Sequence, residues 1–320
     1  MNSARRMWIY GGEADTTGTA FLNDLWYIDV EDSSDSWHQV SVSGTAPTAR
    51  SEHAAVLSAT GRMWIYGGIG ASGILSDVWY IDVEVGSPSW VQMIASGSNP
   101  GPRRAHSAAL TADNEMWIFS GYFVEGGVDD ELWYLEAASP AWVSAGEWTN
   151  ARYDHASGIT ASGRAVVFGG YSGSSAMNDL WTYDTQASSS SWSEISTCCP
   201  PSARYSHTAV MTPAGRMWIC GGWDGSSTYG DLWYIDVEDP SPSWSQVYPS
   251  SGFMERREHV AVITPTGRMW VFGGKDGTGA SYDSLQYIDL EAASPQWITA
   301  SPGGNRPPAL LKPSAAQPSK

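Results

Sequence analysis

The stretch MWIYGG at Met7–Gly12 decides the fold, because it returns unchanged at Met63–Gly68 and in modified form four more times. The modified copies are MWIFSG at Met116–Gly121, AVVFGG at Ala165–Gly170, MWICGG at Met217–Gly222 and MWVFGG at Met269–Gly274. The second glycines of successive copies are 56, 53, 49, 52 and 52 residues apart. A regular period near fifty residues predicts a repeat architecture in which each copy is one structural unit.

One copy, Arg50–Gln92, predicts four short strands. RSEHAAVL at Arg50–Leu57 is rich in strand-forming residues, and Met63–Tyr66 follows it after a short turn. DVWYID at Asp77–Asp82 comes after a polar loop, and a fourth strand starts at Trp90. Short strands in succession with turn residues between them predict one antiparallel meander in each repeat.

The predicted strands are apolar at successive positions instead of at alternate ones. This pattern is typical of sheets that are covered on both faces. Stacking six sheets around an axis covers both faces of each, and the 18 Trp and 15 Tyr side chains supply the bulk to fill the space between sheets. The sequence therefore predicts an all-β fold, a six-bladed β-propeller of four-stranded antiparallel blades.

The repeats predict a single propeller domain at residues 1–311, with glycine doublets near 11, 67, 120, 169, 221 and 273, and a polar C-terminal tail at 312–320. The first copy begins at its second strand, Met7, and lacks a first strand. We expect the segment RPPALL at Arg306–Leu311 to supply that strand and close the ring, although its two prolines cannot donate to a sheet.

Composition restricts the partners. The chain carries 34 acidic and 17 basic residues, a net charge of −17, which disfavours nucleic acid and anionic membrane surfaces. No apolar run approaches the roughly 20 residues that span a bilayer, and we expect no signal peptide.

Three cysteines, two of them adjacent, predict reduced thiols in a cytoplasmic protein and no disulfide framework. We expect a monomer.

The units resemble kelch repeats. The resemblance covers about residues 7–310 and rests on the period, the glycine doublets, a third-strand Tyr after Trp such as Tyr27 or Tyr80, and a spaced fourth-strand Trp such as Trp37 or Trp90. A WD-repeat propeller has a shorter period of about 40–45 residues. The resemblance implies a kelch-type propeller of the non-enzymatic branch, since family members commonly act as substrate adaptors, cytoskeletal partners or trafficking effectors. This implication is an analogy from fold.

Residue types that suggest catalysis recur in every copy. Five histidines each lie three residues after an arginine, in the pattern of Arg50 and His53. We call these the slot arginines and slot histidines: Arg50, Arg103, Arg152, Arg204 and Arg256, with His53, His106, His155, His207 and His259. An active site needs one set of catalytic residues, not the same pair in every repeat. We therefore expect the repeated histidines to be buried structural struts that are held by hydrogen bonds. The acids that open the third strands, such as Asp77, predict turn-capping acceptors. We expect no catalytic residue, no metal site and no cofactor.

Binding is predicted on one rim of the propeller. The loops between strands one and two are nearly uniform, whereas those between strands two and three vary and carry aromatic residues. Exposed aromatics on loops of a rigid scaffold are typical of recognition sites. The predicted contact residues are Tyr122, Phe123, Tyr171, Trp223 and Tyr229, with Arg104, Arg257 and Lys275 as charged contacts.

The predicted cations favour another protein as partner, bound through an acidic peptide segment, because arginine pairs with carboxylates in a bidentate manner. The function predicted is therefore a protein–protein interaction or scaffold module. The alternatives are a small-ligand or metal-dependent enzyme that uses the axial channel, and a glycan-binding module that uses the aromatic rim.

Overall fold

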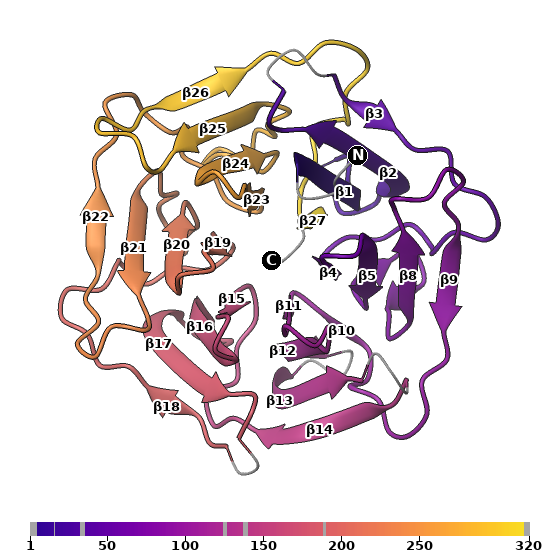
Figure 1. Ribbon diagram of the computed structural model, residues 1–320, viewed down its shortest axis with the longest axis horizontal. Helices are drawn as coiled ribbons and strands as arrows, with labels where there is room; N and C mark the ends of the chain where they lie inside the picture. The colour runs from indigo at the N-terminus through magenta and orange to yellow at the C-terminus, as the bar shows by residue number, and fades with distance from the viewer. Residues whose placement is uncertain are drawn as a thin grey trace.

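The computed structural model describes residues 5–15, 17–32, 36–123, 127–136, 140–187 and 190–316. In these ranges the fold is all-β, and six sheets surround a central axis (Figure 1). The same ranges contain no helix that could span a membrane. The predicted six-bladed propeller is confirmed.

Each blade is an antiparallel sheet whose strands follow one another from the axis outward (Figure 1). The first three blades are β27 (Ser314–Ala316), β1 (Arg6–Glu13), β2 (Phe21–Asp29), β3 (His38–Gln39); β4 (Ala54–Leu57), β5 (Arg62–Tyr66), β8 (Val78–Asp82), β9 (Trp90–Met93); and β11 (Ser107–Leu110), β12 (Met116–Phe123), β13 (Val128–Leu135), β14 (Trp142–Glu147). The other three are β15 (Ala156–Ile159), β16 (Arg164–Tyr171), β17 (Ala176–Asp184), β18 (Ser193–Glu194); β19 (Thr208–Met211), β20 (Arg216–Cys220), β21 (Leu232–Asp236), β22 (Ser245–Val247); and β23 (Val260–Ile263), β24 (Arg268–Phe272), β25 (Leu285–Asp289), β26 (Trp297–Ala300). Short β10 (Arg103–Arg104) also pairs with β12, and β6 (Ile69–Gly70) with β7 (Gly73–Ile74) forms a hairpin in a loop.

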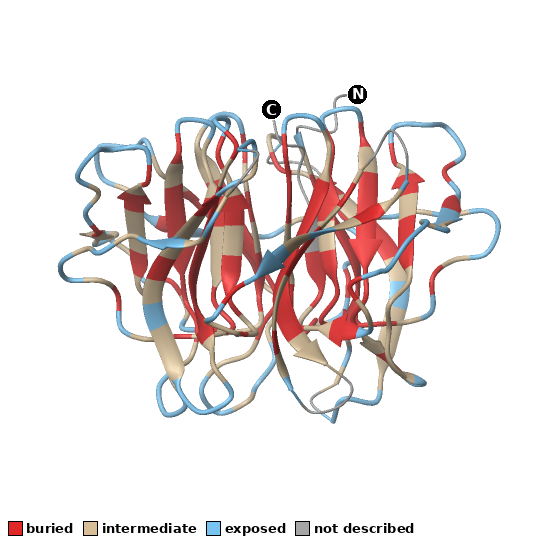
Figure 2. Cartoon of the chain, turned by 90° about the horizontal axis from the view of Figure 1, so that it is seen from below, coloured by how far each residue is buried: buried red, intermediate tan, exposed pale blue. Residues whose placement is uncertain are grey.

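The core lies between the blades. Along β1, Met7 and Ile9 pack toward the sixth blade, and Trp8 and Tyr10 pack toward the second. Successive strand residues point to opposite faces, so a strand with neighbours on both sides is apolar at every position. Figure 2 shows the result as buried strands between two exposed rims of loops.

The second glycine of each doublet joins one blade to the next. Its N–H donates to the carbonyl oxygen of the next blade's slot residue, as Gly68 does to Arg103 at 2.9 Å and Gly170 to Arg204 at 2.8 Å. The same bond recurs at all six blade interfaces and ends at Gly274 and Leu310, also at 2.9 Å. The glycine doublets therefore mark the contacts that assemble the ring.

The backbone at this bond explains why the third copy can read Ser-Gly. Ser120 has φ 48°, a left-handed conformation that a short polar residue tolerates. The second glycines lie at larger angles, such as 94° at Gly68 and 124° at Gly121. A Cβ on Gly68 would lie 2.5 Å from the carbonyl oxygen of Ser51. Only glycine fits the second position.

The slot arginines are fully buried and each stabilises its own blade. Arg152 donates to both carboxylate oxygens of Asp179, at 2.7 and 2.8 Å, and to the carbonyl of Gly169 at 2.9 Å. Asp179 also accepts the indole N–H of Trp181 at 2.7 Å. The third-strand acids were predicted as turn caps, but Asp77, Glu131, Asp179 and Asp231 are ion-pair partners of the slot arginines of their blades. Asp24, whose blade has no slot arginine, accepts the indole N–H of Trp26.

We predict that Arg152→Met lowers the free energy of unfolding by about 3–5 kcal/mol, because it leaves the carboxylate of Asp179 without its buried partner. The matched control is Arg62→Met, which breaks an equally close Arg62–Asp82 pair whose side chains are 39% and 42% exposed. We expect that control to cost at most about 1 kcal/mol. Urea unfolding of both variants measures the difference, and equal losses would contradict the assigned role.

The C-terminal segment closes the ring, but later in the chain than the sequence predicted. Strand β27 pairs with β1 through Tyr10↔Ser314, Ile9↔Ala315 and Trp8↔Ala316, inside the segment 312–320 that was predicted as a tail. Arg306 is exposed and pairs with Asp283. The Gly274–Leu310 bond sets the register. It places Leu310 at the slot position of the first blade, where each of the other five blades carries an arginine.

Truncation tests the closure. A chain that ends at Lys312 loses the β27 hydrogen bonds to β1 and the bond between Ser314 and His53, so we expect its free energy of unfolding to fall by about 2–4 kcal/mol. A chain that ends at Ala316 keeps these bonds and should match the full chain in urea unfolding. A loss of equal size in both truncated chains would argue against β27 as the closing strand.

Candidate binding site at the channel mouth

Six residues, each two positions after the slot residue of its blade, form a closed ring around the axis. Each has a left-handed backbone, with φ between 47° and 60°. Each N–H donates to the carbonyl of the equivalent residue one blade earlier, at 2.8–3.2 Å, and the last bond returns from Glu52 to Lys312. We call these residues the axial ring: Glu52, Ala105, Asp154, Ser206, Glu258 and Lys312. These backbone bonds close the ring whatever side chains its members carry, and an ion pair between Lys312 and Glu52 adds to the last contact.

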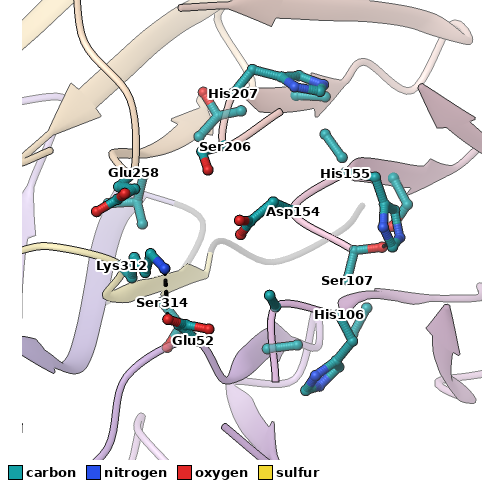
Figure 3. A pocket seen from close by; sticks show the side chains of 18 of the residues that line it. Glu52, His106, Ser107, Asp154, His155, Ser206, His207, Glu258, Lys312 and Ser314 are labelled. Carbon is teal, nitrogen blue, oxygen red and sulfur yellow. Dashed lines mark hydrogen bonds and ion pairs between the residues drawn. The ribbon is translucent and has the colours of Figure 1, made fainter. Parts of the chain in front are cut away.

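The axial ring surrounds a cavity of about 230 Å³ that extends along the innermost strands. Figure 3 shows Asp154, Glu258, Glu52 and Lys312 around the space at the axis. The slot histidines line the same cavity. Among the described residues, no group of three or more His, Cys, Asp or Glu side chains comes together in a way that could hold a metal ion.

Two of the three ring carboxylates are held by cations. Glu52 lies 2.6 Å from Lys312 Nζ and 2.6 Å from the guanidinium of Arg104. Glu258 lies 2.9 Å from Lys275 Nζ. Burial raises the pKa of Glu52, but Lys312 and Arg104 more than offset this and leave that pKa below its ordinary value.

Asp154 is the ring carboxylate that has no ion pair within 4 Å in the part of the chain described. Burial raises the pKa of its carboxyl to about 6, and although the Lys312 charge lowers it, the Glu52 and Glu258 charges raise it further. Ser206 is its hydrogen-bonding neighbour. At neutral pH the cavity therefore contains a carboxylate whose charge is only partly balanced.

The slot histidines are buried, and desolvation lowers the pKa of each below its ordinary value, so they are neutral near pH 7. His155 bonds to the hydroxyl of Ser107 at 2.7 Å, and His259 bonds to that of Thr208 at 2.9 Å. His53 likewise bonds to Ser314. The predicted struts are therefore confirmed for three histidines.

His106 and His207 depart from this pattern. The positions that carry the hydroxyl for the other histidines hold Ala54 and Ala156 here, which offer no partner. These two histidines interact with backbone groups instead, His106 with that of Tyr66 and His207 with that of Phe168.

An arc of aromatic side chains lies beside the axial ring on the variable rim, the end of the propeller that carries the loops between second and third strands. Tyr122 contacts Tyr153, Tyr153 contacts Tyr171, and Tyr171 contacts Tyr205, with ring centroids 5.5, 5.5 and 5.0 Å apart. Trp223 continues it through antiparallel pairing with Tyr205. We call this set the aromatic arc: Tyr122, Tyr153, Tyr171, Tyr205 and Trp223. All five are partly exposed.

An arginine stacks on each end of the aromatic arc. The guanidinium of Arg104 lies 4.8 Å from the ring centroid of Tyr122, and that of Arg257 lies 3.9 Å from the centroid of Trp223. Such cation–π contacts orient the ring and the cation together. Tyr153 and Tyr205 directly precede Asp154 and Ser206 in the chain, so the middle of the arc borders the axial ring.

The predicted contact residues divide into two groups. Tyr122, Tyr171, Trp223, Arg104 and Arg257 lie in or at the ends of the aromatic arc, and Lys275 pairs with the backbone of Arg257 beside it. Phe123 and Tyr229 lie elsewhere, since they stack on the buried guanidinium groups of Arg103 and Arg204 at 4.8 and 4.2 Å.

The sequence reasoning missed Tyr153, Tyr205 and Asp154. The position after each slot arginine holds Ser51, Arg104, Tyr153, Tyr205 and Arg257, and its variation within an otherwise regular repeat was a usable signal. The prediction used that signal only for the two arginines.

Comparison with known proteins agrees with the propeller fold. A family model described as the KLHDC2/KLHL20/DRC7 Kelch-repeats domain matches residues 1–145 and 112–316. The chain belongs to the kelch-repeat family. Membership supports a general role in protein interaction or scaffolding.

The kelch chain is similar to parts of longer proteins. It is 29% identical to Adagio-like protein 3 of Oryza sativa subsp. japonica over 94% of this chain and 41% of that protein. It is 30% identical to the leucine-zipper-like transcriptional regulator 1 homolog of Drosophila melanogaster over 84% of this chain and 28% of that protein. It is 28% identical to serine/threonine-protein phosphatase BSL2 of Arabidopsis thaliana over 72% of this chain and 23% of that protein. The kelch chain thus spans less than half the length of these relatives.

We predict that Asp154→Asn stabilises the kelch propeller at pH 7.5 by about 1–3 kcal/mol and that the gain disappears near pH 4. The folded-state pKa of about 6 lies above the value of 3.8 expected in the unfolded chain. The folded state therefore binds more protons between these values, and the ionised carboxylate costs stability above pH 6. Asparagine removes that cost and tolerates the left-handed backbone.

Urea unfolding at pH 7.5 and pH 4 measures this effect. Asp113→Asn, on an exposed turn of the opposite rim, is the control and should change stability little at either pH. A gain in stability for Asp154→Asn that is the same at both pH values would contradict the assignment of a carboxylate whose pKa is raised in the folded state.

Proposed function

We propose that this kelch propeller is a protein-interaction module whose partner binds across the aromatic arc at the channel mouth. The observation that carries the proposal is the continuity of the arc: five partly exposed aromatic side chains in mutual contact, drawn from three adjacent blades. Tyr and Trp dominate binding hot spots because they bury a large area at little cost in conformational entropy.

The shape of the site supports a protein partner over a small ligand. The cavity of about 230 Å³ is smaller than the 300–1,000 Å³ of ordinary small-molecule pockets. It is large enough for one inserted side chain, while the arc around it offers a surface for the flanking residues. We therefore infer that the partner presents a loop or an extended segment.

The charges at the mouth bear on the predicted acidic peptide. Arg104 and Lys275 already hold Glu52 and Glu258, so their charges are balanced within the propeller. Among the described residues, Arg257 makes no ion pair within 4 Å, and it remains the cation open to a partner carboxylate. The acidic segment, the monomeric state and the cytoplasmic location stay predictions.

The experiment is affinity capture from a lysate of the source cells with three forms of the propeller. The test variant, Tyr171→Ala/Tyr205→Ala/Trp223→Ala, removes the centre of the aromatic arc. The control, Ile94→Ala/Tyr248→Ala, removes exposed side chains that follow outermost strands β9 and β22. We expect the wild type and the control to retain the same partners and the test variant to lose them. Partners retained equally by all three forms would contradict the proposal.

A further inference from the structure

The lining of the axial cavity is acidic. Three carboxylates, Glu52, Asp154 and Glu258, face one ammonium, Lys312, and the histidines in the wall are neutral. Lys312 is bonded to Glu52 at 2.6 Å, so its charge is largely used within the protein. Glu52 and Glu258 are also paired with Arg104 and Lys275, so a group that enters this space meets Asp154 as the carboxylate that has no ion pair among the described residues.

The approach to the cavity is aromatic. The faces of Tyr122 and Trp223 are taken by the propeller's own arginines. Tyr153, Tyr171 and Tyr205 contact one another edge to face, at 60–62°, and no guanidinium stacks on them in the described part of the chain. These three partly exposed rings therefore carry no cation of the propeller's own, and arginine stacks on aromatic rings better than lysine does.

From these two features we propose that the cavity binds the guanidinium of an arginine side chain presented by the partner, with Asp154 as its carboxylate and the central tyrosines of the aromatic arc around its stem. Asp154 is suited to this because it faces the space at the axis and has no ion pair of its own among the described residues (Figure 3). The proposal rests on the proposed function, since the arginine belongs to the bound protein.

The test uses N-acetyl-arginine amide as the probe and N-acetyl-citrulline amide as its uncharged isostere. Saturation-transfer NMR at pH 7.5 and low salt compares their affinities for the full chain. We expect the arginine probe to bind at least tenfold more tightly than the citrulline probe. Asp154→Asn should reduce arginine binding at least tenfold, and it is expected to be more stable than wild type at this pH, so unfolding would not explain the loss.

Glu84→Gln, an exposed residue after β8, removes one negative charge away from the cavity and serves as the control for net charge. It should leave arginine binding unchanged within a factor of two. Equal binding of the two probes, or arginine binding that survives Asp154→Asn, would overturn this inference. The proposed function would still stand in that case if the arc variant loses its captured partners, so the two failures are distinguishable.

Discussion

The hydrogen bond from the second glycine of each doublet to the slot carbonyl of the next blade is the contact on which the rest of the structure depends. It brings the end of a second strand against the start of the neighbouring first strand, where a Cβ would clash with backbone. Repeated at six interfaces, it places equivalent residues of all blades at equal depth along the axis. The axial ring closes because of that equivalence, and Leu310 and Lys312 complete it although their sequence lacks the slot arginine and histidine.

Because backbone bonds close the ring, some positions must keep their residue for stability and others can vary in side chain. Four slot arginines each hold a carboxylate, and one such as that of Asp179 is costly once its partner is removed. The fifth, Arg256, donates to Ser284 and Gln286 instead. The axial ring has no such requirement on its side chains, and it holds Glu, Ala, Asp, Ser, Glu and Lys in turn. The residues beside it vary in the same way. The side chains that differ most from blade to blade therefore lie at the mouth of the channel, where a partner could reach them.

The aromatic arc and the axial cavity adjoin each other in the proposed site. The arc offers apolar area with partly exposed rings, and the cavity adds a charge that the protein does not fully balance. Keeping Asp154 ionised in partly desolvated surroundings costs folding stability, and a complementary cation would recover it on binding. This kind of compromise between stability and recognition is common at functional sites. It also explains how an acidic protein can carry arginines on its variable rim, because Arg104 holds Glu52 and Tyr122, and Arg257 stacks on Trp223.

The sequence by itself determined the fold, since the period of Met7–Gly12, the two-sided apolar strands and the doublets leave a propeller as the architecture that buries them all. It also determined that residues that follow Gly121, Gly170 and Gly222 share one end of the antiparallel blades. Only the tertiary structure decided the closing strand, the pairing of slot arginines with third-strand acids, and the separation of Tyr171 from Tyr229. These depend on register and on side-chain direction across blade interfaces. Distances of that kind are set when the ring closes, and no local pattern in the chain encodes them.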